Sequence, residues 1–446
     1  MDKQLLNLEN KKICFLGLGL ENLSLAKYLA SHGIVATVLD KRTVRELGER
    51  FERINKAGIE FYGGADYLKR ATNFDIIFKT PGFAGKLKPK KGAIITTPME
   101  LFFDLCPAKI IAVTGTKGKG TTSSLIFEIL KTAGKNVWLA GNIGTAPFDF
   151  IDKLKPNHYV ILELSSFQLQ DFKGQPHIAL VTNLFPEHLA PVDPQNPVYH
   201  KSLKEYYSAK ANVFLNQQKG DWLVVNKNNH HLNDLLRRTK ARIVCFKTGG
   251  SLPQKSQLIG RHNQENIAAA CRVAELLKIP AGKIKLAIEN FQGLEHHLEF
   301  IVEINGVKFY NDSASTMPEA TLAAIRAFGR SVILITGGVN KGYDLKKFAK
   351  DLLKSPCSLA IILIGQTSRE LFGYFKKMQN ELENHLSTVY YCGDKNIQEI
   401  VQEIMAIASR EGDIVLFSPG FASFDMFKNS KDRGEKFKET VLALRA

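Results

Sequence analysis

Short apolar runs alternate with longer amphipathic stretches along the whole chain. Runs such as residues 13–16 and 110–113 lead into glycine, and a stretch with helical spacing follows each of them. Parallel strands connected by helices produce this alternation, so the pattern predicts an α/β fold. We expect strands over residues 13–16, 35–40, 75–78, 110–113, 137–140, 159–163, 178–183, 332–336, 359–364 and 414–417, and helices over 21–31 and 122–133.

The length of the chain predicts more than one domain. Its 446 residues exceed what one ordinary hydrophobic core accommodates. The expected strands fall into three α/β blocks, and boundaries near Pro107 and His297 separate them. We therefore expect three domains, over residues 1–107, 108–297 and 298–446.

The composition is that of a soluble globular protein, with 44% hydrophobic and 23% charged residues. No apolar run reaches membrane-spanning length, and the N-terminus lacks the layout of a signal peptide. Six cysteines without a C-x-x-C pair are typical of a reducing compartment. We expect a cytoplasmic protein that has no membrane partner.

The net charge of +16 leaves two interpretations open. The lysines are spread along the chain without a long basic block or an aromatic-interleaved motif, so we expect no nucleic-acid partner. The charge then reflects either a solvated lysine-rich surface or a positive field that attracts a small polyanionic substrate.

A glycine-rich turn follows the apolar run 110–113 and precedes the predicted helix at 122. This order places a nest of backbone N–H groups at a helix N-terminus, where a polyphosphate binds well, and Lys119 adds a point charge. The spacing is shorter than in the usual P-loop pattern, and Gly120 stands where the Mg²⁺-binding hydroxyl is expected, so we assign that role to Thr121. The turn predicts a nucleoside triphosphate site formed by Gly115, Thr116, Lys117, Gly118, Lys119, Gly120, Thr121 and Thr122.

Polar residues stand at the ends of several predicted strands, where open parallel sheets bind their ligands. Glu163 closes one of these strands beside the glycine-rich turn. A carboxylate in that place is a natural Mg²⁺ ligand. The alternative is a helix-capping or surface acid.

The first block carries a weaker signal. Gly17 and Gly19, with Asp40 about twenty residues later, resemble part of a dinucleotide fingerprint whose third glycine is missing. A nicotinamide cofactor, a nucleotide-sugar diphosphate and a merely structural turn remain open as interpretations.

Nine motifs in family order extend the argument over nearly the full chain, and together they resemble the Mur ligase family, most closely its D-glutamate-adding branch. They lie at residues 114–119, 141–144, 163–169, 183–189, 209–210, 260–266, 311–313, 337–342 and 418–425.

The resemblance implies a three-domain enzyme. A Rossmann-like N-terminal domain would hold the UDP-sugar, a central P-loop-type ATPase domain with a parallel sheet would hold ATP, and a Rossmann-like C-terminal domain would bring the amino acid. Such ligases phosphorylate a carboxylate to an acyl phosphate, which the amine then attacks. The implied substrates are UDP-N-acetylmuramoyl-L-alanine, glutamate and ATP with two Mg²⁺ ions, and the implied enzyme is a cytoplasmic monomer of peptidoglycan precursor synthesis.

The resemblance also assigns roles to individual residues. Lys119, Glu163, His188 and Lys210 match the catalytic and metal positions, together with Thr121 as a metal ligand. Lys210 matches a lysine that is carbamylated in the family, which would turn a repelling ammonium into a metal-binding carbamate; the alternative is an unmodified surface lysine.

The remaining matches are substrate contacts. Those for the UDP-sugar are Leu20, Glu21, Lys41, Arg42, Gly82, Asn142 and Ser165. Those for the nucleotide are Asn263, Asn266, His297 and Asp312, and those for the amino acid are Glu187, Thr316, Lys341, Ser423 and Phe424.

Four positions depart from the pattern usual in the D-glutamate branch. Ala314 replaces a lysine, Glu187 an aspartate, His297 an arginine and Ser430 an aromatic residue. These departures keep open a ligase of the same fold for L-glutamate or another amino acid. From a different class, a non-catalytic UDP-sugar or nucleotide-binding protein is the alternative.

Overall fold

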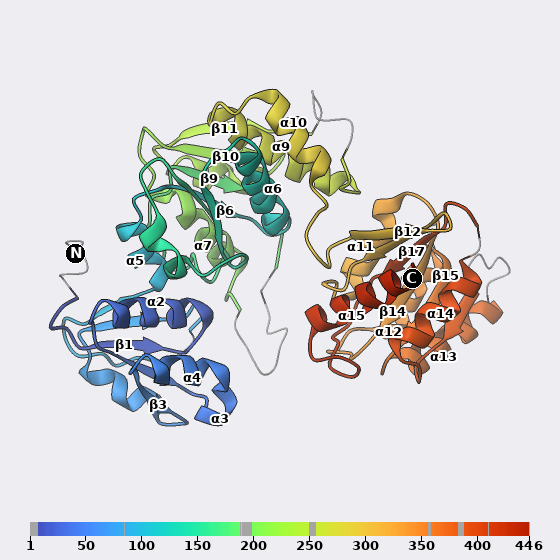
Figure 1. Ribbon diagram of the computed structural model, residues 1–446, viewed down its shortest axis with the longest axis horizontal. Coiled ribbons are helices and arrows are strands. Elements are labelled where there is room, and N and C mark those ends of the chain that lie inside the picture. Colours follow the sequence, from blue (N-terminus) through green and yellow to red (C-terminus); the bar gives the residue numbers. More distant parts are fainter. Residues whose placement is uncertain are drawn as a thin grey trace. The chain divides into compact units, whose positions relative to one another are not determined.

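The computed structural model describes residues 8–83, 85–187, 189, 199–248, 256–355, 358–381, 388–408 and 410–445. The chain forms two compact units, one of Met1–Leu252 with Glu265–Ala287 and one of Pro253–Gln264 with Ile288–Ala446. The first unit contains two sheets and the second unit contains one (Figure 1). Each of the three ranges expected from the sequence thus holds one sheet, while the division into domains stays a prediction.

The first sheet is parallel throughout and has the strand order β3-β2-β1-β4-β5. Its strands are β1 (Ile13–Leu16), β2 (Ala36–Asp40), β3 (Glu60–Gly63), β4 (Ile76–Lys79) and β5 (Ile94–Thr96), and its helices are α2 (Leu20–Ser31), α3 (Val44–Leu47), α4 (Glu49–Lys56) and α5 (Pro98–Leu105). β1 is fully buried at the centre of the sheet. The turn after it therefore lies at a strand end in the middle of the sheet.

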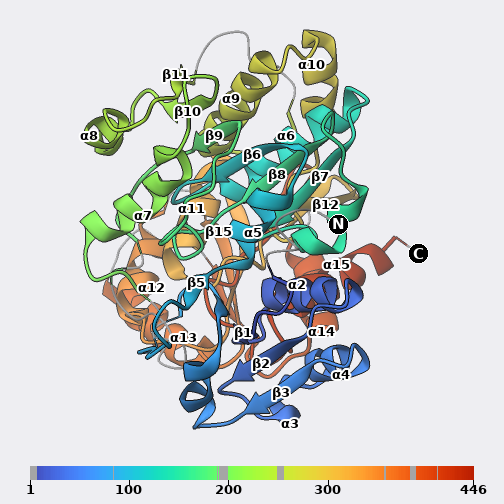
Figure 2. The same cartoon turned by 90° about the vertical axis from the view of Figure 1, so that its left-hand side faces the viewer.

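The second sheet is also parallel, in the order β11-β10-β9-β6-β8-β7; Figure 2 shows β6, β8 and β7 side by side. Its strands are β6 (Lys109–Thr114), β7 (Val137–Gly141), β8 (Tyr159–Glu163), β9 (Ile178–Val181), β10 (Trp222–Asn226) and β11 (Arg242–Phe246). The helices are α6 (Lys119–Thr132), α7 (Leu203–Leu215), α8 (Asn233–Leu236), α9 (Arg261–Leu276) and α10 (Ala281–Asn290). β6 pairs with both β8 and β9, so the ends of these three strands meet at one edge.

The third sheet has the order β12-β13-β17-β14-β15-β16. Its strands are β12 (Glu299–Ile304), β13 (Val307–Asn311), β14 (Val332–Gly337), β15 (Ser358–Ile364), β16 (Thr388–Tyr391) and β17 (Ile414–Phe417), and its helices are α11 (Pro318–Phe328), α12 (Leu345–Leu353), α13 (Ser368–Glu381), α14 (Ile397–Ile407) and α15 (Ser430–Ala443). Alternate residues of β14 face opposite cores: Ile333 and Ile335 lie in one and Leu334 in the other.

The α/β fold and the ten expected strands are confirmed, but the sequence analysis missed several strands. One omission had a readable signal, because β12 and β13 form an antiparallel hairpin across Asn305 and Gly306. Both residues have a positive φ, of 50° and 78°, and Asn-Gly is the favoured pair for such a two-residue turn. The expectation of purely parallel sheets is wrong for this edge.

Within the described part of the chain, no helix combines the length and the apolar character that crossing a bilayer requires. The cysteines described there, Cys14, Cys106, Cys245, Cys271 and Cys392, carry free thiols.

Substitution of Phe417 tests the packing of the third sheet. Its side chain is fully buried and stacks on Phe437 of α15, with 4.3 Å between the ring centroids. We expect Phe417→Ala to lower the free energy of unfolding by about 3–5 kcal/mol, because it leaves a cavity in the core. Denaturant titration measures this loss. Phe424→Ala in the same unit, whose ring is 64% exposed, should change the free energy of unfolding by less than about 0.5 kcal/mol.

Candidate functional site

The glycine-rich turn connects β6 to α6, as the sequence predicts. α6 begins at Lys119, three residues before the expected start, and Gly118 is its N-cap with a φ of 80°. The N–H groups of the first helical turn have no intrahelical partner, so those of Lys119, Gly120 and Thr121 stand at the positive end of the helix dipole. This end of α6 is suited to bind an anion.

The two residues that directly follow β9, Thr182 and Asn183, hold the turn in place. The backbone oxygen of Asn183 accepts the N–H of Thr116, and its side-chain oxygen accepts the N–H of Lys117, both at 2.9 Å. The hydroxyl of Thr182 donates to the carbonyl of Lys117 at 2.7 Å. The expected strand 178–183 ends at Val181. Beyond it, the N–H of Thr182 still donates to the carbonyl of Thr114 at 2.9 Å, while the side chains of Thr182 and Asn183 bond to the turn.

At two positions the turn lies so close to neighbouring side chains that a Cβ would not fit. A Cβ on Gly115 would lie 1.9 Å from Oγ1 of Thr182, and one on Gly118 would lie 2.1 Å from Oδ1 of Asn266. Asn266, on α9, additionally accepts a hydrogen bond from the buried hydroxyl of Thr122 at 3.3 Å. The first unit therefore places this predicted nucleotide contact directly against the turn.

Lys119 and Glu163 face each other beside the turn. Nζ of Lys119 lies 3.9 Å from Oε1 of Glu163 and donates to the carbonyl of Thr116 at 3.1 Å. Glu163 ends β8 and is only 2% exposed, so it is neither a surface acid nor a helix cap. Burial raises the pKa of its carboxyl, which Lys119, Asn142 and Lys210 oppose.

Lys210 approaches the same turn from α7. Its side chain is buried, and Nζ donates to the carbonyl of Gly115 at 2.6 Å. The alternative of a surface lysine is therefore wrong. Burial, assisted by the charge of Lys119, lowers the pKa of Lys210 to about 7, so a large share of the amine is neutral at neutral pH.

Tyr206 is a residue of this site that the sequence analysis missed. It is fully buried one helical turn before Lys210, whose Nζ lies 4.9 Å from the centre of its ring. Its hydroxyl lies 3.0 Å from Oγ1 of Thr116, which in turn accepts the N–H of Phe185 at 3.0 Å. The spacing of four residues from Lys210 was the available signal, because such residues share a helix face.

The expected metal ligands are only partly described. His188 lies outside the described residues, Thr121 is half-buried in the first turn of α6, and Glu187 forms an ion pair with Lys117. Glu163 offers the hard oxygen that Mg²⁺ prefers. Lys210 fits such a site only without its positive charge, since an ammonium repels a cation.

The expected UDP-sugar residues of the first sheet surround the turn after β1. Asp40 accepts the N–H of Leu18 at 2.6 Å and pairs with Arg42 at 2.7 Å. Burial opposes ionisation of Asp40, but the hydrogen bonds from Arg42 and Leu18 dominate and lower the pKa of its carboxyl. The carboxylate thus fixes Arg42 and the turn, while Leu20 and Lys41 are exposed.

Glu21 connects the first sheet to the second. Its Oε1 accepts Nε2 of Gln168 at 2.5 Å, and Oε1 of Gln168 accepts the N–H of Ser165 at 2.7 Å. Asn142 is exposed directly after β7, and its N–H donates to the carbonyl of Glu163 at 2.9 Å. Gly82 lies in the turn after β4 with a φ of 69°. Glu21, Gln168 and Ser165 therefore form one hydrogen-bonded group, and Asn142 is bonded separately to Glu163.

The second unit contains its own group of predicted site residues. Asp312 is buried, and its Oδ2 accepts the hydroxyls of Ser315 at 2.6 Å and Ser418 at 2.7 Å. Burial raises its pKa to about 6. The N–H of Leu298 donates to Oδ1 at 3.1 Å, and His297, next to it, is exposed.

The predicted amino-acid contacts of the second unit lie on three loops. Nζ of Lys341 lies 5.6 Å from the ring centre of Phe424, which is mostly exposed. Ser423 is buried and Thr316 half-buried. The structure thus brings Lys341 and Phe424 together.

Asn263, a predicted nucleotide contact, lies elsewhere in the second unit and donates to the carbonyl of Ile259 at 2.8 Å.

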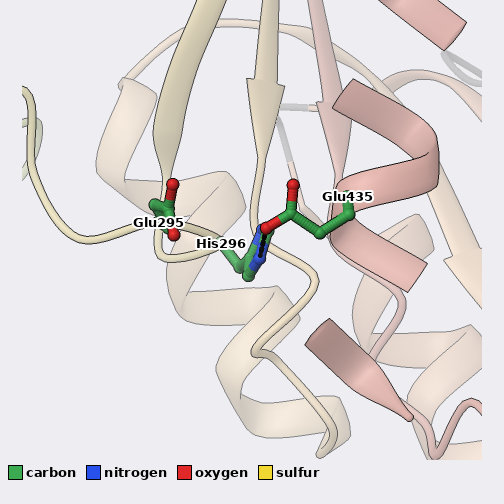
Figure 3. Close-up of side chains that lie close together, drawn as sticks. All are labelled: Glu295, His296 and Glu435. Carbon is green, nitrogen blue, oxygen red and sulfur yellow. Dashed lines mark ion pairs between the residues drawn. The ribbon is translucent and has the colours of Figure 1, made fainter. Parts of the chain in front are cut away.

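The second unit also contains a separate cluster of titratable side chains, formed by Glu295, His296 and Glu435 (Figure 3). Nε2 of His296 lies 3.4 Å from Glu435, while Nδ1 lies 2.9 Å from Nδ2 of Asn311. Asn311 Oδ1 accepts the N–H of Ser313, so its Nδ2 faces the histidine as a donor. Nδ1 then accepts and Nε2 carries the proton, which leaves no lone pair for a metal.

Lys438 supports this interpretation of the cluster. Its Nζ lies 3.7 Å from Glu295 and 2.5 Å from Glu299. Lys438 thus already pairs with Glu295 of this cluster, and His296 faces Glu435 with its N–H, so the arrangement fits a structural polar network better than a metal site.

Comparisons with known proteins agree with the motifs. The profile described as Mur ligase middle domain matches residues 113–251. The UDP-N-acetylmuramoylalanine–D-glutamate ligase of Clostridium tetani is 37% identical over 458 residues, covering 97% of this chain and 96% of that protein. The enzyme of the same name from Clostridium novyi is 38% identical, covering 97% of each.

Solved structures show the same fold at low sequence identity. The UDP-N-acetylmuramate–alanine ligase of Thermotoga maritima aligns with a TM-score of 0.57 at 17% identity, covering 98% of this chain and 100% of that one. A MurF ligase from the same organism, solved in complex with ADP, aligns with a TM-score of 0.56 at 14% identity, covering 92% and 96%.

Gly118 tests the geometry of the turn. Gly118→Ala places a Cβ in a left-handed conformation and against Asn266. We expect it to weaken ATP binding, measured by calorimetry, by at least about tenfold, because the turn must shift to relieve the contact. Gly134→Ala is the matched control, since Gly134 has a φ of 73° but nothing within 4 Å of the added Cβ. Equal ATP affinities of both variants would contradict the prediction.

Proposed function

This chain belongs to the Mur ligase family, and we propose that it joins D-glutamate to UDP-N-acetylmuramoyl-L-alanine at the expense of ATP. It is an ATP-dependent acid–amino-acid ligase, and its product is a precursor of cell-wall peptidoglycan. The names of its relatives, at 36–38% identity over nearly the full chain, support this substrate choice.

The observation that carries the proposal is the convergence of Lys119, Glu163 and Lys210 on the glycine-rich turn. Lys119 Nζ is 3.9 Å from Glu163, and Lys210 Nζ is 2.6 Å from the carbonyl of Gly115. Two lysines, a carboxylate that can hold a metal ion, and a helix N-terminus suit a reaction between a carboxylate and a triphosphate, since both reactants are anions.

We infer the following steps. The N-terminus of α6 and Lys119 hold the terminal phosphates of ATP and stabilise the charge of the transferred phosphoryl group. The carboxylate of UDP-N-acetylmuramoyl-L-alanine attacks the γ-phosphorus, and ADP leaves. The amine of D-glutamate then attacks the acyl carbon of the acyl phosphate, loses a proton, and expels phosphate as the amide forms.

Glu163 is the residue of the described chain best placed to bind Mg²⁺, with Thr121, His188 and a modified Lys210 as further ligands. Mg²⁺ bound there would neutralise phosphate charge. We expect two such ions. The carboxylate of Glu163 would hold its ion in a fixed place, because Glu163 belongs to β8, a buried strand of the sheet.

Lys210 would take part as a carbamate. The ammonium first loses one proton, and the neutral amine then attacks carbon dioxide. An N–C bond forms while one C=O π pair moves to oxygen, and a second proton leaves the nitrogen, so that the charge changes from +1 to −1 overall. Burial favours the neutral amine that this step needs. The carbamate would then relieve the repulsion between Lys210 and Lys119.

The other assignments concern the substrates. We propose that residues 1–107 bind the UDP-sugar, 108–297 ATP and 298–446 D-glutamate. Arg42 would pair with the diphosphate, and Lys341 with a carboxylate of D-glutamate. Ala314 and Ser430 leave the enantiomer to be tested. We further propose a monomer that acts in the cytoplasm without a nucleic-acid or membrane partner.

Phosphate release tests the function. We expect the purified protein to release phosphate from ATP when UDP-N-acetylmuramoyl-L-alanine and D-glutamate are both present, and L-glutamate to support at most about 1% of that rate. Lys119→Ala should reduce the rate by at least about a hundredfold, because the variant lacks the positive charge that stabilises the terminal phosphates of ATP. Equal rates with both enantiomers would contradict the substrate choice, and no release with either would contradict the ligase itself.

Lys210→Arg tests the carbamate. Arginine keeps the positive charge but offers no neutral amine, so we expect the rate of phosphate release to fall by at least about a hundredfold. Protein equilibrated with ¹³C-bicarbonate should show a carbamate carbon signal by NMR that disappears in this variant. Lys204→Arg, at an exposed position of the same helix, should keep both the signal and the rate. A carbamate signal that survives in Lys210→Arg would refute the assignment.

A further inference from the structure

Arg433 is the largest of the fully buried side chains in the described part of the chain, and the mechanism above does not use it. It lies on α15 and is 1% exposed. Burial lowers the pKa of its guanidinium to about 10, so it stays charged at neutral pH. No carboxylate of the described residues lies within ion-pair distance of it, although Asp425 and Asp312 act on it from further away.

The guanidinium is held by neutral oxygen atoms of two loops. Nε donates to Oγ of Ser313 at 3.0 Å, and Nη2 donates to the carbonyl of the same residue at 2.9 Å. Nη1 donates to the carbonyl of Phe421 at 3.0 Å. The hydroxyl of Ser313 in turn donates to the carbonyl of Ser430, at the start of α15, at 2.8 Å.

The two loops carry predicted contacts for different substrates. Ser313 follows Asp312 directly, which we assign to the nucleotide, and Phe421 precedes Ser423 by two residues, which we assign to D-glutamate. A second link joins the same loops, since Ser418 donates to Asp312 at 2.7 Å. The fork of Arg433 is thus one of the contacts that fix both loops to the body of the second unit, beside the backbone hydrogen bond from Gly420 to the carbonyl of Ser315 at 2.9 Å.

Energetics distinguishes this arrangement from ordinary packing. A buried charge without an ionic partner costs stability, and an apolar side chain of similar volume is often the more stable choice at such a place. What only a guanidinium supplies is a planar fork with several donors in fixed directions. Three hydrogen bonds to two loops use that property directly.

We propose that Arg433 is a positioning residue of the ligase, which holds the loop of Asp312 and the loop of Ser423 in one register so that ATP and D-glutamate are bound in the correct mutual geometry. This role rests on the proposed function. It acts on two of the three substrates only, because the predicted UDP-sugar contacts belong to the first unit.

The test compares Michaelis constants in Arg433→Lys. Lysine keeps the charge but loses the fork, so the loops lose their common register. We expect the KM for D-glutamate and the KM for ATP each to rise about tenfold, while the KM for UDP-N-acetylmuramoyl-L-alanine stays within about twofold of the wild type. A role in stability alone would lower the active fraction and the apparent kcat, and would leave all three Michaelis constants unchanged.

Two further variants complete the experiment. Arg330→Lys is the matched control, because exposed Arg330 also donates to a backbone carbonyl of the second unit, that of Gly412 at 2.8 Å; its three Michaelis constants should equal those of the wild type. Ser313→Ala keeps Arg433 and removes one acceptor, so it should raise the same two constants about threefold, even if Arg433→Lys does not fold.

The outcomes separate the two levels of the argument. An active wild type with unchanged constants for D-glutamate and ATP in Ser313→Ala, and in Arg433→Lys where that variant folds, would overturn the role of Arg433 alone. A wild type that releases no phosphate from ATP would overturn the proposed function, and the role of Arg433 with it.

Discussion

The hydrogen bonds between the glycine-rich turn and the end of β9 are the constraint on which the central site depends. Asn183 accepts hydrogen bonds from two N–H groups of the turn, and the hydroxyl of Thr182 donates to the backbone carbonyl of Lys117. Gly115 permits the close approach to Thr182, and Gly118 permits that of Asn266 on α9, because neither glycine has a Cβ. These hydrogen bonds restrain the conformation of the turn. Its N–H groups are oriented in advance, which makes electrostatic stabilisation of a developing charge effective.

The charges beside the turn follow from the same packing. Glu163 and Lys210 are both buried near Lys119, and burial shifts the pKa of each toward its neutral form. Mg²⁺ would supply the positive charge that two anionic reactants require, and the oxygens of Glu163 and of a carbamate on Lys210 would hold it. Burial makes such charges interact more strongly than they do in water.

The second unit positions its residues by different means. Asp312 is surrounded by the hydroxyls of Ser315 and Ser418, and Arg433 by carbonyl and hydroxyl oxygens. Each buried charge is satisfied by neutral partners that belong to neighbouring loops. Such hydrogen bonds to a charged group are strong, and they connect the loops more firmly than apolar packing does. The loops gain a defined geometry, at a cost in the stability of the unit.

The sequence by itself determined the α/β class, the turn after β6, and the residue types that could serve it. Those features are local: alternation of apolar runs, glycine at fixed offsets and a lysine at a helix start all act over a few neighbouring residues. It also contained the Asn305-Gly306 hairpin signal, which was overlooked.

Only the tertiary structure decided which of these residues meet. Lys210 and Gly115 lie 95 residues apart in the chain and are joined by one hydrogen bond, and whether Lys210 is exposed or buried determines the charge state of its amine. Tyr206 and Arg433 are not themselves motif residues, and they matter through the atoms that distant strands and loops bring to them. Burial and long-range hydrogen bonding depend on the folded chain as a whole, which is why local patterns cannot supply them.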